Sequence, residues 1–308
     1  MNIEKYQGIF PAFYACYDEQ GSISPERVEA YTAWLIKKGV KGIYVGGSSG
    51  ECIYQSVADR KLLLEHAMKV AKGKLTVIAH VACNSTADSM ELAAHAESLG
   101  VDAIASIPPI YFKLPEHAIA KYWNDISSAA PNTDFIIYNI PQLAGTALTL
   151  PLLREMLKNP RVIGVKNSSM PVQDIQKFKY EGSLDGRDFV VFNGPDEQFI
   201  SGRLMGADGG IGGTYSVMPE LFIKLDELFR AGDHGTARAL QYDINNIIYT
   251  LVSGHGNLYA MMKASLRLRE GLELGGVRPP FPNTIDSDRP IVERATEMIR
   301  TAIAKYVG

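Results

Sequence analysis

Lys166 stands at the carboxyl end of a short apolar run, where its side chain could do chemistry. Residues 162–165 are apolar or small and mostly β-branched, which predicts a buried strand. An ammonium group at such a place is costly to desolvate, so we expect its pKa to fall and the neutral amine to be accessible near neutral pH. A neutral lysine amine attacks ketones to form Schiff bases. The alternative is a side chain that extends from the strand end into water.

Two further features could assist such an amine. The turn over residues 46–51, GGSSGE, offers closely spaced backbone N–H groups and the hydroxyls of Ser48 and Ser49, which suit a carboxylate or a phosphate. A plain tight turn has the same composition. Tyr138 ends another apolar run, where a phenol can move a proton or can simply pack in the core. Together these features favour a lysine iminium with a 2-keto acid, formed while a C–C bond is made or broken.

The other candidate groups give weaker indications. Asp196 and Glu197 could pair as acid and base, or could charge a helix N-terminus. The six histidines are scattered without HxxH or HExxH spacing, and we expect His80 to be a packed core residue. We therefore expect no metal and no cofactor, since an iminium is itself the electron sink.

Eight apolar runs alternate with amphipathic stretches and would position these groups. The expected strands cover residues 8–17, 42–45, 75–81, 101–107, 135–139, 162–169, 189–193 and 209–214. Helical periodicity or a capping residue follows each of the first seven. This alternation predicts an α/β fold, a (β/α)8 TIM barrel with a C-terminal helical extension. Residues 1–217 would hold the strands and the first seven helices. Residues 218–308 would hold the last barrel helix and a helical appendix, in one continuous unit.

Catalytic groups of such a barrel lie at the carboxyl ends of its strands. The residues that end or follow the apolar runs are therefore the candidates for the site, among them Ser48, Ser49, Tyr111, Tyr138, Asn139, Lys166, Ser168, Asn193, Gly194, Asp196, Glu197, Thr214 and Tyr215.

Composition excludes several classes of protein. The formal net charge of −3 leaves no basic footprint, so we expect no nucleic-acid partner. No apolar run approaches a membrane span, and the first residues lack the apolar stretch of a secretory signal. The three cysteines lack CxxC spacing and suit a reducing cytoplasm. We expect a cytoplasmic enzyme acting on a small molecule.

Four segments together resemble a known family. GGSSGE, the YNIP of residues 138–141, the GVKNSS of residues 164–169 and the glycine-rich run of residues 206–215 are similar to the pyruvate-dependent class I aldolases, the dihydrodipicolinate synthase / N-acetylneuraminate lyase superfamily. The resemblance covers essentially the whole chain and is closest to the sialic acid lyase branch. It implies reversible cleavage of N-acetylneuraminate to N-acetylmannosamine and pyruvate. The alternative is another aldolase of this group, acting on a 2-keto-3-deoxy sugar acid, or a dihydrodipicolinate synthase.

The resemblance also implies roles for individual residues. Lys166 would form the Schiff base, and Tyr138 would transfer protons. Tyr138 and the Ser48–Ser49 turn would hold the pyruvyl carboxylate, and Ser48 would link Tyr138 to Tyr111 of a neighbouring subunit. The sugar chain would be bound by four residues: Ser168, Gly194, Asp196 and Glu197. Members of the family are commonly homotetramers.

Two positions depart from the family's patterns. Leu143 stands where the synthases usually carry an arginine that binds the carboxylate of the second substrate. Loss of that guanidinium removes bidentate recognition and disfavours the synthase. Gly213 stands where many sialic acid lyases carry a serine that contacts the sugar.

Overall fold

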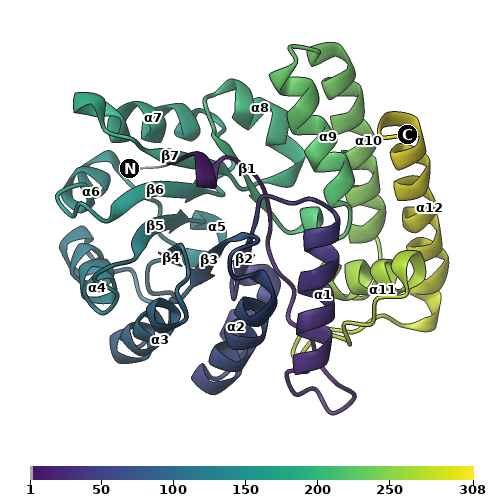
Figure 1. Cartoon of the computed structure of the whole chain (residues 1–308), viewed down its shortest axis with the longest axis horizontal. Coiled ribbons are helices and arrows are strands. Elements are labelled where there is room, and N and C mark those ends of the chain that lie inside the picture. The colour runs from purple at the N-terminus through teal and green to yellow at the C-terminus, as the bar shows by residue number, and fades with distance from the viewer. Residues whose placement is uncertain (1–2) are drawn as a thin grey trace.

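The computed structural model describes residues 3–308. Within that range, eight parallel strands form one sheet, in which β2 to β8 pair in chain order and β1 pairs with β8. A parallel bridge between Ala12 and Tyr44 joins the end of β1 to β2, so the ring closes into the predicted TIM barrel (Figure 1). The strands are β1 (Gly8–Pro11), β2 (Gly42–Val45), β3 (Thr76–His80), β4 (Ala103–Ser106), β5 (Asp134–Asn139), β6 (Val162–Asn167), β7 (Val190–Asn193) and β8 (Gly209–Gly212).

Helices surround the barrel and extend it on one side (Figure 1). The barrel helices and short connecting helices are α1 (Pro25–Lys37), α2 (Val57–Ala71), α3 (Thr86–Leu99), α4 (Glu116–Ser128), α5 (Pro141–Ala144), α6 (Leu150–Met156), α7 (Gln173–Gly182), α8 (Phe199–Leu204) and α9 (Pro219–Arg230). Three more helices follow them: α10 (His234–Val252), α11 (Leu258–Glu270) and α12 (Arg289–Tyr306). Short 3-10 helices follow three of the strands at their carboxyl ends: η2 (Ser48–Gly50), η5 (Asp196–Gln198) and η6 (Thr214–Ser216).

Local sequence explains where the first helices begin. The Ser24 hydroxyl accepts the Arg27 amide, and Pro25 occupies the first turn of α1, where no N–H is needed. Ser56 and Asp59 form a reciprocal capping box at the start of α2. Each cap contributes about 1 kcal/mol to helix stability.

Two apolar cores hold the barrel together. The inner core fills the ring with side chains from alternate strand positions, among them Phe10, Tyr44, Tyr138 and Phe192. The outer core lies between the sheet and the helices and continues into the extension, where Met261 is fully buried. Because strand residues alternate between these two cores, a residue's place in the strand decides whether it faces the site or the helices.

The first strand is shorter than predicted. We expected a strand over residues 8–17, but β1 ends at Pro11. The amides of Ala12 and Phe13 still donate to Gly212 and Tyr44 carbonyls, and the chain then leaves the barrel. The Tyr17 amide donates to Leu274 instead, so this segment follows the C-terminal extension and not the sheet.

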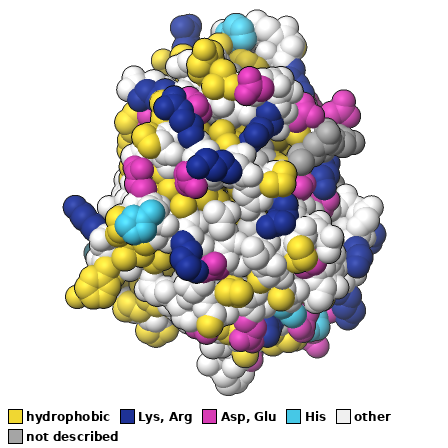
Figure 2. Space-filling model, turned by 90° about the vertical axis from the view of Figure 1, so that its left-hand side faces the viewer, with side chains coloured by type: hydrophobic (Ala, Val, Ile, Leu, Met, Phe, Trp, Pro, Cys, Tyr) yellow, Lys and Arg dark blue, Asp and Glu magenta, His cyan; other side chains and the backbone are white. Residues whose placement is uncertain are grey.

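The extension packs along one flank of the barrel. In Figure 1, α10 lies beside α9, while α11 and α12 lie against each other at the outer edge. Among residues 3–308, no helix combines the length and the apolar character that crossing a membrane requires. On the face shown in Figure 2, basic and acidic side chains are interspersed and form no continuous basic stripe.

Candidate active site

Lys166 and Tyr138 lie side by side at the carboxyl end of the barrel. They are directly paired in the register of β5 and β6, so their side chains point to the same face of the sheet. The Lys166 Nζ atom lies 3.9 Å from the centroid of the Tyr138 ring. The Lys166 side chain does not extend into water, because the residue is only 4% exposed. The sequence-predicted pair is therefore brought together inside the barrel mouth.

The surroundings of Lys166 favour its neutral amine. Burial is the main influence and lowers the pKa of Lys166 to about 7, while the Asp196 carboxylate acts in the opposite direction. A lysine with this pKa is about half deprotonated at neutral pH. The amine can therefore act as a nucleophile without a separate base to remove its proton.

The neighbours of Tyr138 set the pKa of its phenol. Burial raises the pKa of Tyr138 to about 12, and hydrogen bonds with the Ser48 and Ser168 side chains oppose this shift. In the resting site the phenol is therefore protonated. A cation that forms on the adjacent nitrogen would favour the phenolate, because an opposite charge nearby stabilises the ionised form.

The GGSSGE turn of residues 46–51, called the serine turn from here on, lies beside this pair. Its backbone closes on itself through the amides of Gly50 and Glu51, which donate to the carbonyls of Gly47 and Ser48. Ser49 is buried, and its side chain lies near the Tyr259 hydroxyl of α11 and lowers the pKa of that phenol. The Ser48 side chain faces Tyr138. The turn thus presents the Ser48 hydroxyl toward Tyr138 and the Ser49 hydroxyl toward Tyr259.

A buried ion pair anchors the end of the same turn. Glu51 has a left-handed backbone (φ 58°) and is 1% exposed. Its carboxylate accepts from Lys263 Nζ of α11 at 3.0 Å and from the Arg278 amide at 2.8 Å. Because Tyr259 and Lys263 are four residues apart, they lie on one face of α11 and reach Ser49 and Glu51 together. The C-terminal extension is therefore part of the wall of the site.

Asp196 and Glu197 have different surroundings. Asp196 is buried, and its Oδ2 atom accepts from the Thr214 amide at 2.7 Å and from the Thr214 hydroxyl at 2.6 Å. Its Oδ1 atom has no hydrogen-bond partner within the described part of the chain. Burial raises the pKa of Asp196 to about 7. Glu197 is exposed. The two carboxylates therefore do not form a buried acid–base pair.

Glycines leave room where the strand ends converge. A Cβ atom at Gly194 would lie 2.0 Å from Ser168 Oγ, and one at Gly212 would lie 2.0 Å from Asp196 Oδ1. At Gly213 it would lie 2.9 Å from Ser49 Oγ. A side chain at position 213, where many sialic acid lyases carry a serine, would therefore require the Ser49 hydroxyl to shift.

Tyr111 is not part of this cluster in the single chain. It is 90% exposed, in the loop after β4, with a positive φ of 83°. Its ring meets Phe112 edge-on and borders a separate cavity of about 680 Å³. This position leaves its ring free to contact another molecule.

The sequence interpretation missed Tyr44 and Tyr259. The centroid of the Tyr44 ring lies 4.3 Å from Lys166 Nζ, and strand alternation could have indicated that it faces inward. Tyr259 carried no local signal, since its place depends on how α11 packs. His80 is buried, as expected. Its Nδ1 atom donates to the Gly46 carbonyl, and burial holds its pKa well below the usual value, so the ring is neutral.

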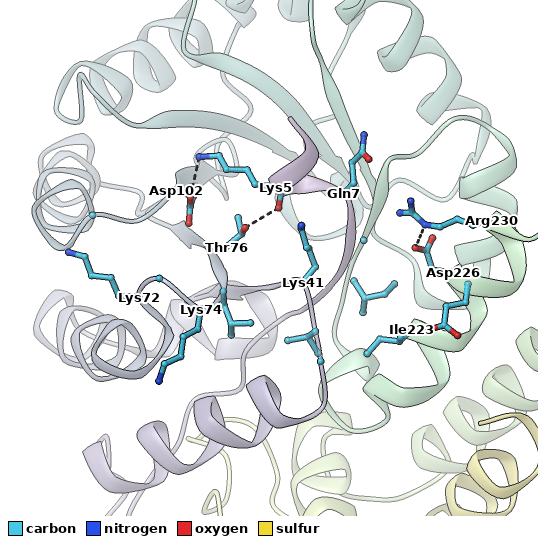
Figure 3. A pocket seen from close by; sticks show the side chains of 18 residues that line it. Lys5, Gln7, Lys41, Lys72, Lys74, Thr76, Asp102, Ile223, Asp226 and Arg230 are labelled. Carbon is cyan, nitrogen blue, oxygen red and sulfur yellow. Dashed lines mark hydrogen bonds and ion pairs between the residues drawn. The ribbon is translucent and has the colours of Figure 1, made fainter. Parts of the chain in front are cut away.

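No metal site accompanies these groups. Among residues 3–308, no group of three or more His, Cys, Asp or Glu side chains is arranged to hold a metal ion. A different cavity, of about 920 Å³, opens at the amino ends of the strands and is bordered by Lys5, Lys41, Lys72 and Lys74 (Figure 3).

Comparison with known proteins agrees with this arrangement. An N-acetylneuraminate lyase of Mediterraneibacter gnavus is 66% identical over 306 residues, which cover 99% of this chain and 96% of that protein. A structure of wild-type sialic acid aldolase of Ruminococcus gnavus, also 66% identical, superposes with a TM-score of 0.96 over 98% of this chain and 99% of that one. A Clostridium difficile structure described as CdNal in complex with mannosamine is 28% identical and has a TM-score of 0.87 over 96% of this chain and 99% of that one.

The family assignment rests on the same extent of the chain. The sequence pattern of the Dihydrodipicolinate synthetase family matches residues 5–299, which include the whole barrel and most of the extension. The chain therefore belongs to the Dihydrodipicolinate synthetase family.

Proposed function

We propose that this protein is an N-acetylneuraminate lyase that cleaves its substrate reversibly to N-acetylmannosamine and pyruvate through a Schiff base on Lys166. The observation that carries the proposal is the buried Lys166 amine, with a pKa of about 7, beside Tyr138 and the serine turn. The similarity to the lyase of Mediterraneibacter gnavus supports the choice of sugar.

The first step forms the iminium. The lone pair of Lys166 Nζ attacks the C2 ketone of the open-chain sugar acid. The carbonyl oxygen takes up protons and leaves as water, which produces a cationic C=N bond. Tyr138 supplies one of these protons and the attacking nitrogen supplies the other, and the hydroxyls of Ser48 and Ser49 bind the C1 carboxylate. No metal is needed, because the iminium accepts the electrons of the next step.

The second step breaks the C3–C4 bond. The Tyr138 phenolate, favoured by the adjacent iminium, removes the proton of the C4 hydroxyl. The C4 oxygen forms the aldehyde of N-acetylmannosamine, and the electrons of the broken bond move into C2 and nitrogen as an enamine. Protonation at C3 and hydrolysis then release pyruvate and restore the lysine.

The sugar chain would lie toward β7 and β8. Asp196 Oδ1, which has no partner within residues 3–308, is the acceptor that we assign to a sugar hydroxyl. Ser168, Gly194 and Glu197 complete the proposed sugar side. Leu143 is 64% exposed at the position of the synthase arginine and offers no charge to a second carboxylate, which disfavours the synthase.

The assembly and the location belong to the same proposal. We expect a homotetramer in which Tyr111 of one subunit reaches Ser48 and Tyr138 of its neighbour, and its exposed ring is compatible with that contact. We expect the enzyme to work in the cytoplasm.

Two measurements test the proposal. Pyruvate release from N-acetylneuraminate should exceed that from 2-keto-3-deoxygluconate, and the reverse order would replace the sugar. Borohydride reduction in the presence of pyruvate should add one carboxyethyl group per chain, located at Lys166 by peptide mass spectrometry. Absence of this adduct would rule out the Schiff base.

A further inference from the structure

Tyr44 is a second aromatic residue in contact with the reacting nitrogen. It lies on β2, across the barrel mouth from β6, and is fully buried. Its ring centroid lies 4.3 Å from Lys166 Nζ, close to the 3.9 Å of Tyr138. The two tyrosine rings meet edge to face, with centroids 5.8 Å apart and planes at 81°. The amine therefore lies over the faces of two rings at once.

The fold fixes the Tyr44 ring in this place. The residue belongs to the inner core, where it is packed among the side chains that fill the ring of strands. The His80 ring lies 6.1 Å away, between centroids. A Cβ atom at Gly47 would lie 2.5 Å from Tyr44 Cε1, so the glycine of the serine turn leaves the space that the ring occupies. The ring is thus immobilised before any substrate arrives.

The contact is made by the ring and not by the hydroxyl. The Tyr44 hydroxyl is buried and has no hydrogen-bond partner within residues 3–308. Tyr138 differs from it, because the Ser48 and Ser168 side chains lie near the Tyr138 hydroxyl and lower its pKa. Tyr44 therefore offers the amine a π face but no proton relay.

We propose that Tyr44 is a further catalytic residue, whose ring face, with that of Tyr138, stabilises the iminium cation on Lys166. This inference rests on the proposed Schiff-base function. A neutral amine, a ketone and a proton combine to give an iminium and water, so one positive charge appears at Nζ in a place closed to solvent. The face of an aromatic ring attracts a cation, and the attraction is stronger where water is excluded. The ring holds the charge until the electrons of the C3–C4 bond neutralise it.

Fluorinated phenylalanines at position 44 test the proposal without changing the packing. Fluorine withdraws electron density from the ring face and leaves its volume nearly unchanged. Tyr44→Phe keeps an electron-rich ring face and is the reference for the series, and its iminium population with pyruvate is measured by borohydride trapping and intact mass. Successive replacement by 4-fluoro-, 3,5-difluoro- and 3,4,5-trifluorophenylalanine should lower that population stepwise, by about tenfold over the series, as loss of a desolvated cation–π contact requires.

A matched series at Phe10 controls for fluorination itself. Phe10 is fully buried in the same inner core and packs edge-on against Phe192. The same fluorinated residues there should leave trapping unchanged. An iminium population that is constant across the Tyr44 series would overturn the proposal, and so would a large loss in Tyr44→Phe, which would assign the effect to the hydroxyl. If the wild-type chain forms no adduct, the Schiff-base function fails first, and this inference fails with it.

Discussion

The two mouths of the barrel both contain lysines, but only the carboxyl mouth buries one of them. At the amino ends of the strands, a cavity of about 920 Å³ is bordered by four lysines, and three of them, Lys41, Lys72 and Lys74, are exposed (Figure 3). The fourth, Lys5, has a 36% exposed side chain and an ion pair with Asp102 at 3.1 Å. At the carboxyl ends, Lys166 is buried between two aromatic rings.

The difference is one of solvent and not of residue type. At the amino mouth, Lys41, Lys72 and Lys74 are open to water, and Lys5 also pairs with the Asp102 carboxylate. Burial removes that contact with water from Lys166 and lowers its pKa. The cavity at the amino mouth therefore does not mark the proposed catalytic site. Exclusion of water from Lys166 is the better indicator of that site.

The largest expected effect is the loss of Lys166 itself. Lys166→Ala should abolish pyruvate release and borohydride trapping, because no other amine lies in contact with Tyr138 within residues 3–308. Lys41→Ala, at the amino mouth, should retain wild-type turnover and is the matched control. Both variants are measured by steady-state assay after their folding is checked by circular dichroism. Residual trapping in Lys166→Ala would show that another amine forms the Schiff base, and that burial of Lys166 does not distinguish the two mouths.

Removal of the Tyr138 hydroxyl should have the next largest effect. Tyr138→Phe keeps the ring beside Lys166 but removes the hydroxyl that we propose transfers protons, and should lower kcat by about 10²–10⁴-fold, the usual range for a positioned acid or base. The iminium should still form with pyruvate, although more slowly. A variant with wild-type kcat would show that the proton moves through another group.

A buried ion pair should matter far more than an exposed one. Lys263→Met removes the ion-pair partner of the buried Glu51 side chain, and should lower the free energy of unfolding by about 3–5 kcal/mol. Lys5→Met at the amino mouth removes an exposed pair and should cost about 0.2–1 kcal/mol. Urea denaturation of both variants measures the difference. Equal losses would mean that the Lys263–Glu51 ion pair between α11 and the serine turn does not hold the turn in place.

Local pattern predicted the parts of the site that lie on strands. An apolar run with a polar end gave the positions of Lys166 and Tyr138, because strand period and barrel geometry together put strand ends at one mouth. The pattern could not tell which of Asp196 and Glu197 is buried, since both follow the same strand. It also gave no indication of Tyr259 or Lys263, because helix packing brings them to a turn more than 200 residues earlier in the chain.

The smallest expected effect is on the pH dependence of borohydride trapping, which a substitution at the carboxyl mouth should shift and one at the amino mouth should not. Because the pKa of Lys166 is lowered to about 7, the neutral amine is lost as pH falls through 7, and the trapping rate should decrease about tenfold per unit below about pH 6. The Asp196 carboxylate stabilises the ammonium, so Asp196→Asn should move this acid limb to lower pH. Glu227→Gln, at the exposed amino mouth, should leave the limb in place, because charges there are screened by water. The initial rate of borohydride trapping with pyruvate, measured from pH 5 to 9, gives the profiles of the wild-type chain and of both variants. Pyruvate is used because Asp196 has its own proposed role in sugar binding, which this measurement avoids. An acid limb that stays fixed in Asp196→Asn would mean that the carboxylate does not interact with the amine across the site.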